Sequence, residues 1–374
     1  MQAIRGAVYS VLLLAFAAIA FVTPATAQYD LTRLTQLARG ALVGVGVDTP
    51  VTGFELLVLQ HGQPIYHRAF GDMSLGEVVS TDSSSKTMSG ALMMALTDNV
   101  SGFSLESRLA DYLPEYRKPG YGAITLRQAF THTSGLLGQD AGSSILANPN
   151  ITLRQSAALI ADTPLENGPP GSTFAYGGLS MQAAGAAAEV ATGASYTSLF
   201  DQFIADPLQL QSTRFRLASP TNPRVAGGIE STATDFARLM DMLLNNGVDR
   251  ATGARVLSEA AVEEMLTRQT TDAQGIDQSP TDNNRYGIGV WLDQLTQAGP
   301  AVDALAGGAR GFHSWIDQDE GLVFVFSTDR TRFSNVEELS SRMHTAILRA
   351  IPEPSAAGLL ACGLLLTGKR RRSS

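Results

Sequence analysis

Strand-like segments lie near both ends of the chain, and a long stretch with mostly helical patterns separates them. The segments with strand patterns are 53–59 and 64–70, which flank a short turn at 61–63, followed much later by 286–292, 313–317 and 322–327. Strands at both ends have to meet in one sheet, so this order predicts an α+β fold in which a sheet domain carries a helical insertion. We expect the sheet part at about 28–82 and 281–351, and the insertion at about 83–280.

The expected helices begin at residues whose side chains can accept a hydrogen bond from the first free backbone N–H groups. Asp30 is the expected cap of a first helix with Leu31 and Leu34, and Thr125 is the expected cap of a helix at 126–133. Thr232 or Thr234 is expected to cap a helix at 235–244. Ser334 forms a capping box with Glu337 and is expected to cap a last helix that ends at 351. Alanine dominates another helix, 178–192, and its small side chains suit close packing.

The N-terminal segment has the character of a secretory signal peptide. Residues 1–27 contain Arg5, an apolar run at 11–22, and Ala25-Thr26-Ala27 as a cleavage site. An N-terminal membrane anchor is the alternative, although the apolar run is short for one. The segment therefore predicts an exported protein that depends on export machinery.

The last residues, 352–374, form a tripartite tail. Pro352-Glu353-Pro354 is followed by an apolar run at 356–366 and four basic residues at 369–372. The tail resembles a PEP-CTERM sorting signal of Gram-negative bacteria, which an exosortase-type enzyme recognises. A short tail anchor is the alternative, but the run is shorter than the roughly 17 residues that cross a bilayer comfortably. Either way we expect the domain in the periplasm, at the outer cell surface or in the extracellular matrix, with the membrane involved only through the terminal segments.

The composition excludes several classes of function. Lys and Arg number 27 against 35 Asp and Glu, and removing residues 1–27 and 355–374 takes away five basic residues, which leaves a net charge of −13. An acidic domain is a poor partner for nucleic acid. The single cysteine, Cys362, lies in the tail, so no disulfide is expected in the domain. Neither the histidine spacing nor any motif supports a metal, and we expect no cofactor.

A candidate nucleophile lies at the start of a helical stretch, in Ser83-Ser84-Ser85-Lys86. A serine three residues before a lysine places both side chains on one helix face, one turn apart. The amine is then close to the hydroxyl, which is a poor nucleophile until a neighbour takes its proton. The free N–H groups of a helix start also point toward the reacting atom. Because Ser-x-x-Lys occurs by chance in many proteins, the motif needs support from other segments.

That support comes from several segments that follow in order. Beyond the Ser-x-x-Lys motif, they are 104–116 with Leu-Pro-Glu, 126–136 with His-Thr-Ser-Gly, 170–176 ending in a tyrosine, 227–232, 286–291, and Gly-Gly-Ala at 307–309 before Trp-Ile-Asp at 315–317. Over about residues 53–350 the chain resembles the serine β-lactamase-related hydrolases, which include class C β-lactamases, D-alanyl-D-alanine peptidases and β-lactamase-fold esterases. The resemblance implies a β-lactamase/penicillin-binding-protein-like fold: an antiparallel sheet flanked by helices, with a helical inserted subdomain.

The resemblance also implies roles within the site. Ser83 attacks a carbonyl and forms an acyl-enzyme. Lys86 and Tyr176 share the proton transfers, and which of the two is the acylation base stays open. The backbone N–H groups of Ser83 and Ala309 form the oxyanion hole. The expected partner is a small ester or acyl substrate.

Four more residues are expected near the substrate. Gly307 and Gly308 let the strand before Ala309 approach the substrate closely. Gly178 is the third residue of the tyrosine motif that begins at Tyr176, the position that contacts the substrate in relatives. Arg310 either binds an anionic substrate or is an ordinary exposed arginine, and neither interpretation is favoured.

Two further polar residues invite functional interpretations. His132 lies at an expected helix end, where we favour a structural role, as a cation or a cap, over a serine–histidine pair. Glu230 lies beside Gly227-Gly228, and we expect a solvated loop carboxylate there.

The chain departs from the family pattern at two substrate-binding positions. The family's Tyr-x-Asn is Tyr176-Gly177-Gly178 here, and Ala306 replaces the lysine or histidine that often precedes Gly-Gly. Each lost hydrogen bond to a charged group weakens binding by roughly 1.5–3 kcal/mol. Because esters need neither contact, the sequence favours an esterase-like hydrolase over a β-lactamase or a D-Ala-D-Ala carboxypeptidase. A catalytically weak, surface-displayed binding protein of the same fold is the second alternative, although intact Ser83, Lys86 and Tyr176 count against it.

Overall fold

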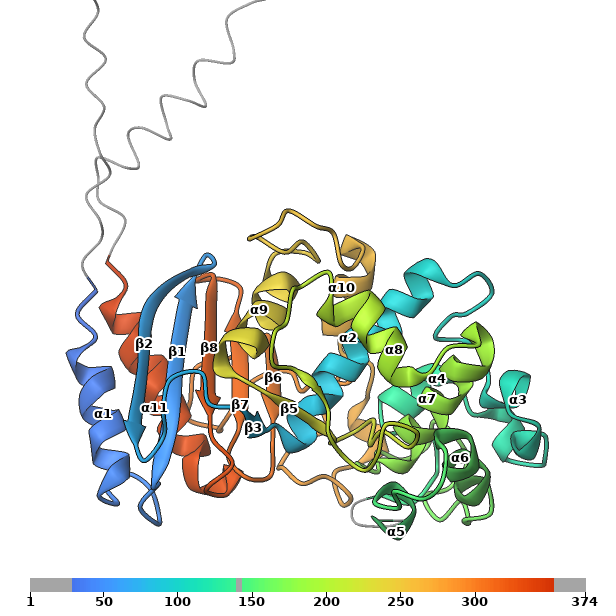
Figure 1. Ribbon diagram of the computed structural model, residues 1–374. Helices are drawn as coiled ribbons and strands as arrows, with labels where there is room; N and C mark the ends of the chain where they lie inside the picture. The colour runs from blue at the N-terminus through green and yellow to red at the C-terminus, as the bar shows by residue number, and fades with distance from the viewer. Residues whose placement is uncertain (1–28, 139–142, 353–374) are drawn as a thin grey trace, which may run out of the picture. The chain divides into compact units, whose positions relative to one another are not determined.

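Five antiparallel strands from the two ends of the chain form one sheet, as the sequence predicts (Figure 1). The structure is a computed structural model that describes residues 29–138 and 143–352. Its elements are α1 (Thr32–Leu42), β1 (Gly53–Gln60), β2 (Gln63–Gly71), β3 (Val79–Ser80), the 3-10 helix η1 (Asp82–Ser84), α2 (Ser85–Asn99), α3 (Leu109–Tyr112), α4 (Leu126–Phe130), α5 (Ser143–Leu146), α6 (Leu153–Ala161), α7 (Leu179–Thr192), α8 (Tyr196–Phe200), β4 (Arg214–Phe215), β5 (Ile229–Ser231), α9 (Ala233–Leu244), α10 (Glu259–Leu266), β6 (Ala304–Gly307), β7 (His313–Asp317), β8 (Leu322–Ser327) and α11 (Phe333–Ala350).

The strand order β2–β1–β8–β7–β6 places strands from opposite ends of the chain side by side. Glu55 on β1 pairs with Ser327 on β8, near one end of both strands. β8 is buried along its whole length, because α1 and α11 pack on one face of the sheet and α9 packs on the other. α9 belongs to the stretch expected as the helical insertion, so one helix of that stretch is part of the sheet layers.

α2 is the central helix of the helical part, and all its residues from Ser85 to Leu96 are buried. It packs against α8 and α10, and the segment after 286 crosses it closely. Gly90 marks that crossing, since a Cβ there would lie 2.3 Å from the carbonyl oxygen of Ile288. A helix enclosed in this way holds the side chains of its first turn in fixed positions.

Several local predictions are confirmed. The hairpin, the strands at 313–317 and 322–327 and the alanine-rich helix all appear with nearly the expected bounds. Asp30 accepts a hydrogen bond from the backbone N–H of Thr32, and Thr232 rather than Thr234 caps α9. These elements could be predicted because their signals are local: the pattern of apolar residues along the segment, and a capping side chain at its start.

The strand expected at 286–292 is wrong. Among the described residues this segment makes only isolated bridges, one of them between Tyr286 and Trp291. Ile288 donates to the carbonyl of Met265 in α10, whereas Trp291 exchanges two hydrogen bonds with Leu305 of β6. The apolar residues of the segment are buried between other elements, and burial alone produced the strand-like pattern.

Two other expectations differ from the structure. The capping box at Ser334 is wrong, because α11 begins at Phe333 and no side chain caps it. The helix after Thr125 ends at Phe130, earlier than expected. The small sheet β3–β5–β4 was not predicted, because its strands are two or three residues long and too short to show a periodic pattern.

The expected signal peptide at 1–27 and the tail beyond Pro352, with Cys362, lie outside the described residues. Among the residues that the structure describes, no helix combines the length and the apolar composition needed to cross a membrane.

Candidate active site

The structure places the serine and the lysine of the Ser-x-x-Lys motif in direct contact. Ser83 lies in η1, immediately before α2, and Lys86 lies in the first turn of α2. The Lys86 Nζ atom donates hydrogen bonds to Ser83 Oγ at 3.1 Å and to the carbonyl oxygen of Ala226 at 2.9 Å. Lys86 is 4% exposed, whereas Ser83 is half-buried and borders a cleft. The amine is therefore held against the hydroxyl, and the hydroxyl remains open to a ligand.

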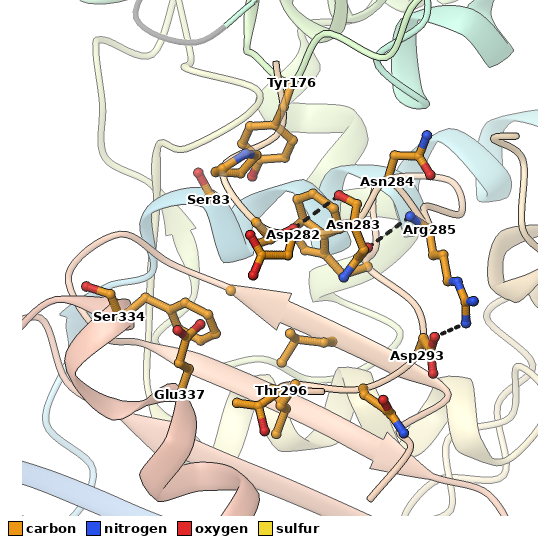
Figure 2. Close-up of a pocket in the computed structure, with 18 of the residues that line it drawn as sticks. Ser83, Tyr176, Asp282, Asn283, Asn284, Arg285, Asp293, Thr296, Ser334 and Glu337 are labelled. Atoms are coloured by element: carbon orange, nitrogen blue, oxygen red, sulfur yellow. Dashed lines mark hydrogen bonds and ion pairs between the residues drawn. The ribbon is translucent and has the colours of Figure 1, made fainter. Parts of the chain in front are cut away.

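Tyr176 lies beside this pair. The Lys86 Nζ atom is 4.5 Å from the centroid of the Tyr176 ring, and Figure 2 shows the tyrosine next to Ser83. The ring stacks on Trp291 at a centroid distance of 5.3 Å, which fixes its plane. The Tyr176 hydroxyl makes no hydrogen bond to any of the described residues, so it is free to bond a ligand or to take part in a proton transfer.

The two polar residues with contested roles are both held by structural contacts. His132 is buried, and burial, together with the charge of Lys86, holds its pKa well below the usual value. Its Nδ1 atom accepts a hydrogen bond from the N–H of Gly177 at 3.4 Å, so the ring is neutral with the proton on Nε2. The lowered pKa shows that the cation expected at the helix end is wrong, and the structural role of His132 stays a prediction. Glu230 lies on β5 and pairs with Arg214, which corrects its interpretation as a solvated loop carboxylate.

The backbone N–H groups of Ser83 and Ala309, two residues that line the cleft, donate no hydrogen bond to any of the described residues. Ala309 follows β6, and Gly307 and Gly308 line the same cleft. A Cβ on Gly308 would lie 2.4 Å from the carbonyl oxygen of Thr81, so glycine allows the end of β6 to contact the segment that carries the nucleophile. Free donors on two adjoining segments suit an oxyanion.

The other expected substrate contacts are distributed differently. Gly178 caps α7 and packs near Leu146, and it is not among the residues that line the cleft. Ala306 is buried on β6 and adds no polar group. Arg310 lines the cleft, but its guanidinium group donates two hydrogen bonds to Asp82.

The cleft itself has a volume of about 1220 Å3. Sequence reasoning missed its far wall, which the loops 280–285 and 291–297 form together with Ser334 and Glu337 of α11 (Figure 2). Burial, reinforced by the nearby charge of Asp282, raises the pKa of Glu337. Apart from Trp291, which ends the motif 286–291, no motif covers these loops, so the sequence held no signal for them.

Comparisons with known proteins agree with this architecture. The profile of the family described as Beta-lactamase matches residues 38–345. A curated relative, the D-alanyl-D-alanine-carboxypeptidase/endopeptidase AmpH of Escherichia coli K12, is 27% identical over 326 residues, which cover 77% of this chain and 82% of the relative.

Solved structures share the fold. EstCE1, a hydrolase with promiscuous acyltransferase activity, superposes with a TM-score of 0.70 at 20% identity, over 84% of this chain and 97% of that one. The octameric penicillin-binding protein homologue from Pyrococcus abyssi gives 0.68 at 15% identity, over 87% and 79% of the two chains.

Proposed function

Because this chain belongs to the Beta-lactamase family of serine hydrolases, we propose that it hydrolyses small esters through an acyl-enzyme on Ser83. The observation that carries the proposal is the 3.1 Å hydrogen bond between Lys86 Nζ and Ser83 Oγ beside an open cleft. A serine held against a buried amine is an activated nucleophile.

The proposed reaction has two steps. Ser83 Oγ attacks the ester carbonyl while Lys86 and Tyr176 take up its proton, and the N–H groups of Ser83 and Ala309 bond the developing oxyanion. The C–O bond to the alcohol then breaks, and the alcohol leaves with that proton. In the second step water attacks the acyl-enzyme and gives a proton to the same two side chains. The bond between the acyl carbon and Ser83 Oγ then breaks, Ser83 Oγ takes that proton, and the acid is released.

The preference for esters rests on two missing polar groups. Gly178 and Ala306 stand where relatives often carry an asparagine and a basic residue, and neither adds a polar side chain to the cleft. Substrates that rely on those contacts lose roughly 1.5–3 kcal/mol for each one. An ester with a good leaving group relies on neither.

A fluorophosphonate probe followed by mass spectrometry tests the nucleophile. We expect the adduct on Ser83 in the full chain and none in Ser83→Ala, whereas Ser84→Ala, in which a buried neighbour is replaced, should still be labelled. An adduct on another serine would refute Ser83 as the nucleophile, and no adduct at all would favour a non-catalytic binding protein.

A β-lactamase or D-Ala-D-Ala carboxypeptidase is the second candidate, and one observation favours it. Arg332 lines the cleft, and its side chain forms no ion pair or hydrogen bond with the described residues, so its guanidinium group could hold a substrate carboxylate. AmpH is also named for carboxypeptidase activity. The kcat/KM values for p-nitrophenyl butyrate, nitrocefin and a D-Ala-D-Ala peptide decide between the candidates. We expect the ester to be best, and equal or higher values for the other two would reverse the assignment.

We also propose that the protein is exported and loses both terminal segments. The proposal rests on the sequence of 1–27 and 352–374. Intact-mass analysis of protein from the native host tests it. A mature mass that still includes Lys369 to Ser374 would refute removal of the tail and leave the hydrolase assignment unaffected.

A further inference from the structure

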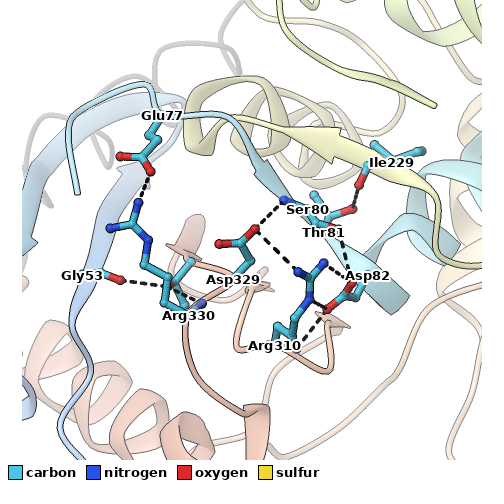
Figure 3. Close-up of polar contacts among 10 residues, drawn as sticks. Gly53, Glu77, Ser80, Thr81, Asp82, Ile229, Arg310, Asp329 and Arg330 are labelled. Carbon is cyan, nitrogen blue, oxygen red and sulfur yellow. Dashed lines mark hydrogen bonds and ion pairs between the residues drawn. The ribbon is translucent and has the colours of Figure 1, made fainter. Parts of the chain in front are cut away.

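The residues that flank the two proposed oxyanion donors bind each other. Asp82 directly precedes Ser83, and Arg310 directly follows Ala309. The Asp82 carboxylate accepts three hydrogen bonds from Arg310: one from the backbone N–H at 3.0 Å, one from Nε at 3.0 Å and one from Nη2 at 2.9 Å (Figure 3). Planar, forked contacts of this kind are strongly directional.

A second layer of polar contacts supports this pair. The Ser80 hydroxyl donates to Asp82 Oδ1 at 3.2 Å, and the Ser80 backbone N–H donates to Asp329 Oδ2 at 3.3 Å. Asp329, just after β8, is also 3.9 Å from Arg310 Nη1. The network therefore connects η1, the turn after β6 and the end of β8, and the hydrogen bond to Asp82 raises the pKa of Arg310, which stays charged.

The backbone at Asp82 is held in an unusual conformation. Its φ angle is +46°, in the left-handed region that L-residues seldom adopt, although aspartate tolerates it better than most. Three hydrogen bonds to its side chain offset that cost and fix the direction in which the chain enters Ser83. The same bonds hold the backbone at Arg310, one residue beyond the other donor.

We propose that the Asp82–Arg310 pair is a positioning pair, which sets the spacing between the Ser83 and Ala309 N–H groups. This inference rests on the proposed acyl-enzyme reaction, and it gives Arg310 a role other than binding an anionic substrate. Without the pair, each donor moves with its own segment, and an oxyanion hole whose donors are displaced by about 1 Å loses roughly a hundredfold in rate.

The test compares Asp82→Asn, Arg310→Gln and Arg310→Lys with the unaltered protein. Asparagine tolerates the left-handed backbone as aspartate does, so Asp82→Asn weakens the pair without adding backbone strain. The readouts are kcat and KM for p-nitrophenyl butyrate, the Ki of phenylboronic acid, whose boron forms a tetrahedral adduct with the serine oxygen, and the rate of fluorophosphonate labelling of Ser83.

We expect kcat to fall by about 10- to 100-fold in Asp82→Asn and Arg310→Gln, with KM within about twofold and the boronate Ki raised in parallel with the loss in kcat. Arg310→Lys keeps the charge but loses the fork, so it should lie between these variants and the unaltered protein. The matched control is Arg238→Gln, which breaks an equally forked pair with Asp249, at 2.9 and 2.8 Å, away from the cleft. It should lower the Tm and leave kcat unchanged.

Three other outcomes would overturn the inference. An unchanged kcat in both variants shows that the pair positions nothing, and a raised KM with unchanged kcat shows that Arg310 binds substrate. A boronate Ki that stays constant while kcat falls rules out the oxyanion hole as the target. If the unaltered protein does not hydrolyse the ester but is labelled at Ser83, the proposed function fails, and the labelling rates of the variants still decide the inference.

Discussion

Gly308→Ala should remove most of the activity while the protein stays folded. An alanine Cβ at this position would lie 2.4 Å from the carbonyl oxygen of Thr81 and 3.0 Å from that of Phe312. Both are backbone atoms and cannot rotate away. Restoring an ordinary contact of about 3.4 Å to Thr81 requires a displacement of about 1 Å between the end of β6 and the segment before Ser83.

The expected effect follows from that displacement. A shift of about 1 Å at a catalytic group costs roughly a hundredfold in rate, equivalent to about 2.7 kcal/mol of transition-state stabilisation. Overpacking by one methyl group costs about 1–3 kcal/mol of folding free energy, which leaves the protein folded at 25 °C. We therefore expect kcat for p-nitrophenyl butyrate to fall about a hundredfold while the Tm falls by only a few degrees.

Steady-state kinetics at 25 °C and a thermal unfolding scan measure the two effects separately. Gly122→Ala is the control, because its Cβ would meet only the carbonyl oxygen of Tyr116 at an ordinary 3.6 Å, away from the cleft. At Gly307 the nearest atoms to a Cβ belong to the Phe333 ring, at 3.8 Å, so Gly307→Ala should lose much less activity than Gly308→Ala. Equal losses from both glycines, or full activity in Gly308→Ala, would refute the argument from crowding.

Three further predictions concern proton transfer and pH. Lys86→Ala, Tyr176→Phe and the double variant should lose similar activity, because the effects of groups that act as a unit are not additive. If the increase in ΔG‡ of the double variant equals the sum of the increases in the two single variants, the two side chains have independent roles. The hydrogen bonds from Arg238 lower the pKa of Asp249 from 3.8 to about 2, so this carboxylate stabilises the fold by about 2 kcal/mol above pH 3.8 and the contribution disappears as the pH falls toward 2. Asp249→Asn should remove that stability at pH 7 in chemical unfolding, and an unchanged unfolding free energy would contradict the assignment. Burial lowers the pKa of His313 from 6.5 to about 4, so its neutral form contributes stability that is complete above pH 6.5 and falls by about 3 kcal/mol as the pH drops through 4. Unfolding curves of the protein and of His313→Gln between pH 7 and 4 measure this contribution of His313 to the unfolding free energy. The same pH dependence of the unfolding free energy in both proteins would contradict the prediction.

The sequence could predict those parts of the fold that have local signals. The hairpin, β7 and β8 were predicted because strand-like runs and a turn are visible in a few residues. The segment 286–292 was not, because residues buried among helices have the same apolar pattern as a strand. Only the packing of the whole chain distinguishes the two cases.

In the candidate site, too, contacts between residues close in sequence could be predicted and contacts between distant residues could not. Ser83 and Lys86 are three residues apart, so helix geometry alone predicts their contact, and the structure shows it. The contact between Asp82 and Arg310 joins residues 228 positions apart, and no spacing rule brings them together. The substrate-facing loops were also missed, since a loop's position depends on the elements that it connects.

The pairing of Glu55 with Ser327 also shapes how the chain folds. Bringing these residues together closes a loop of about 270 residues, which costs roughly 5 kcal/mol of chain entropy beyond a constant term. Contacts of such long range slow folding, whereas the turn that holds Ser83 and Lys86 can form early. The Ala309 donor reaches Ser83 only when another loop of similar length closes, because these two residues are 226 positions apart. A chain that stops before β6 would therefore contain the nucleophile and its base without the groups that stabilise the oxyanion, and hydrolytic activity would arise late, in the same cooperative step that completes the sheet.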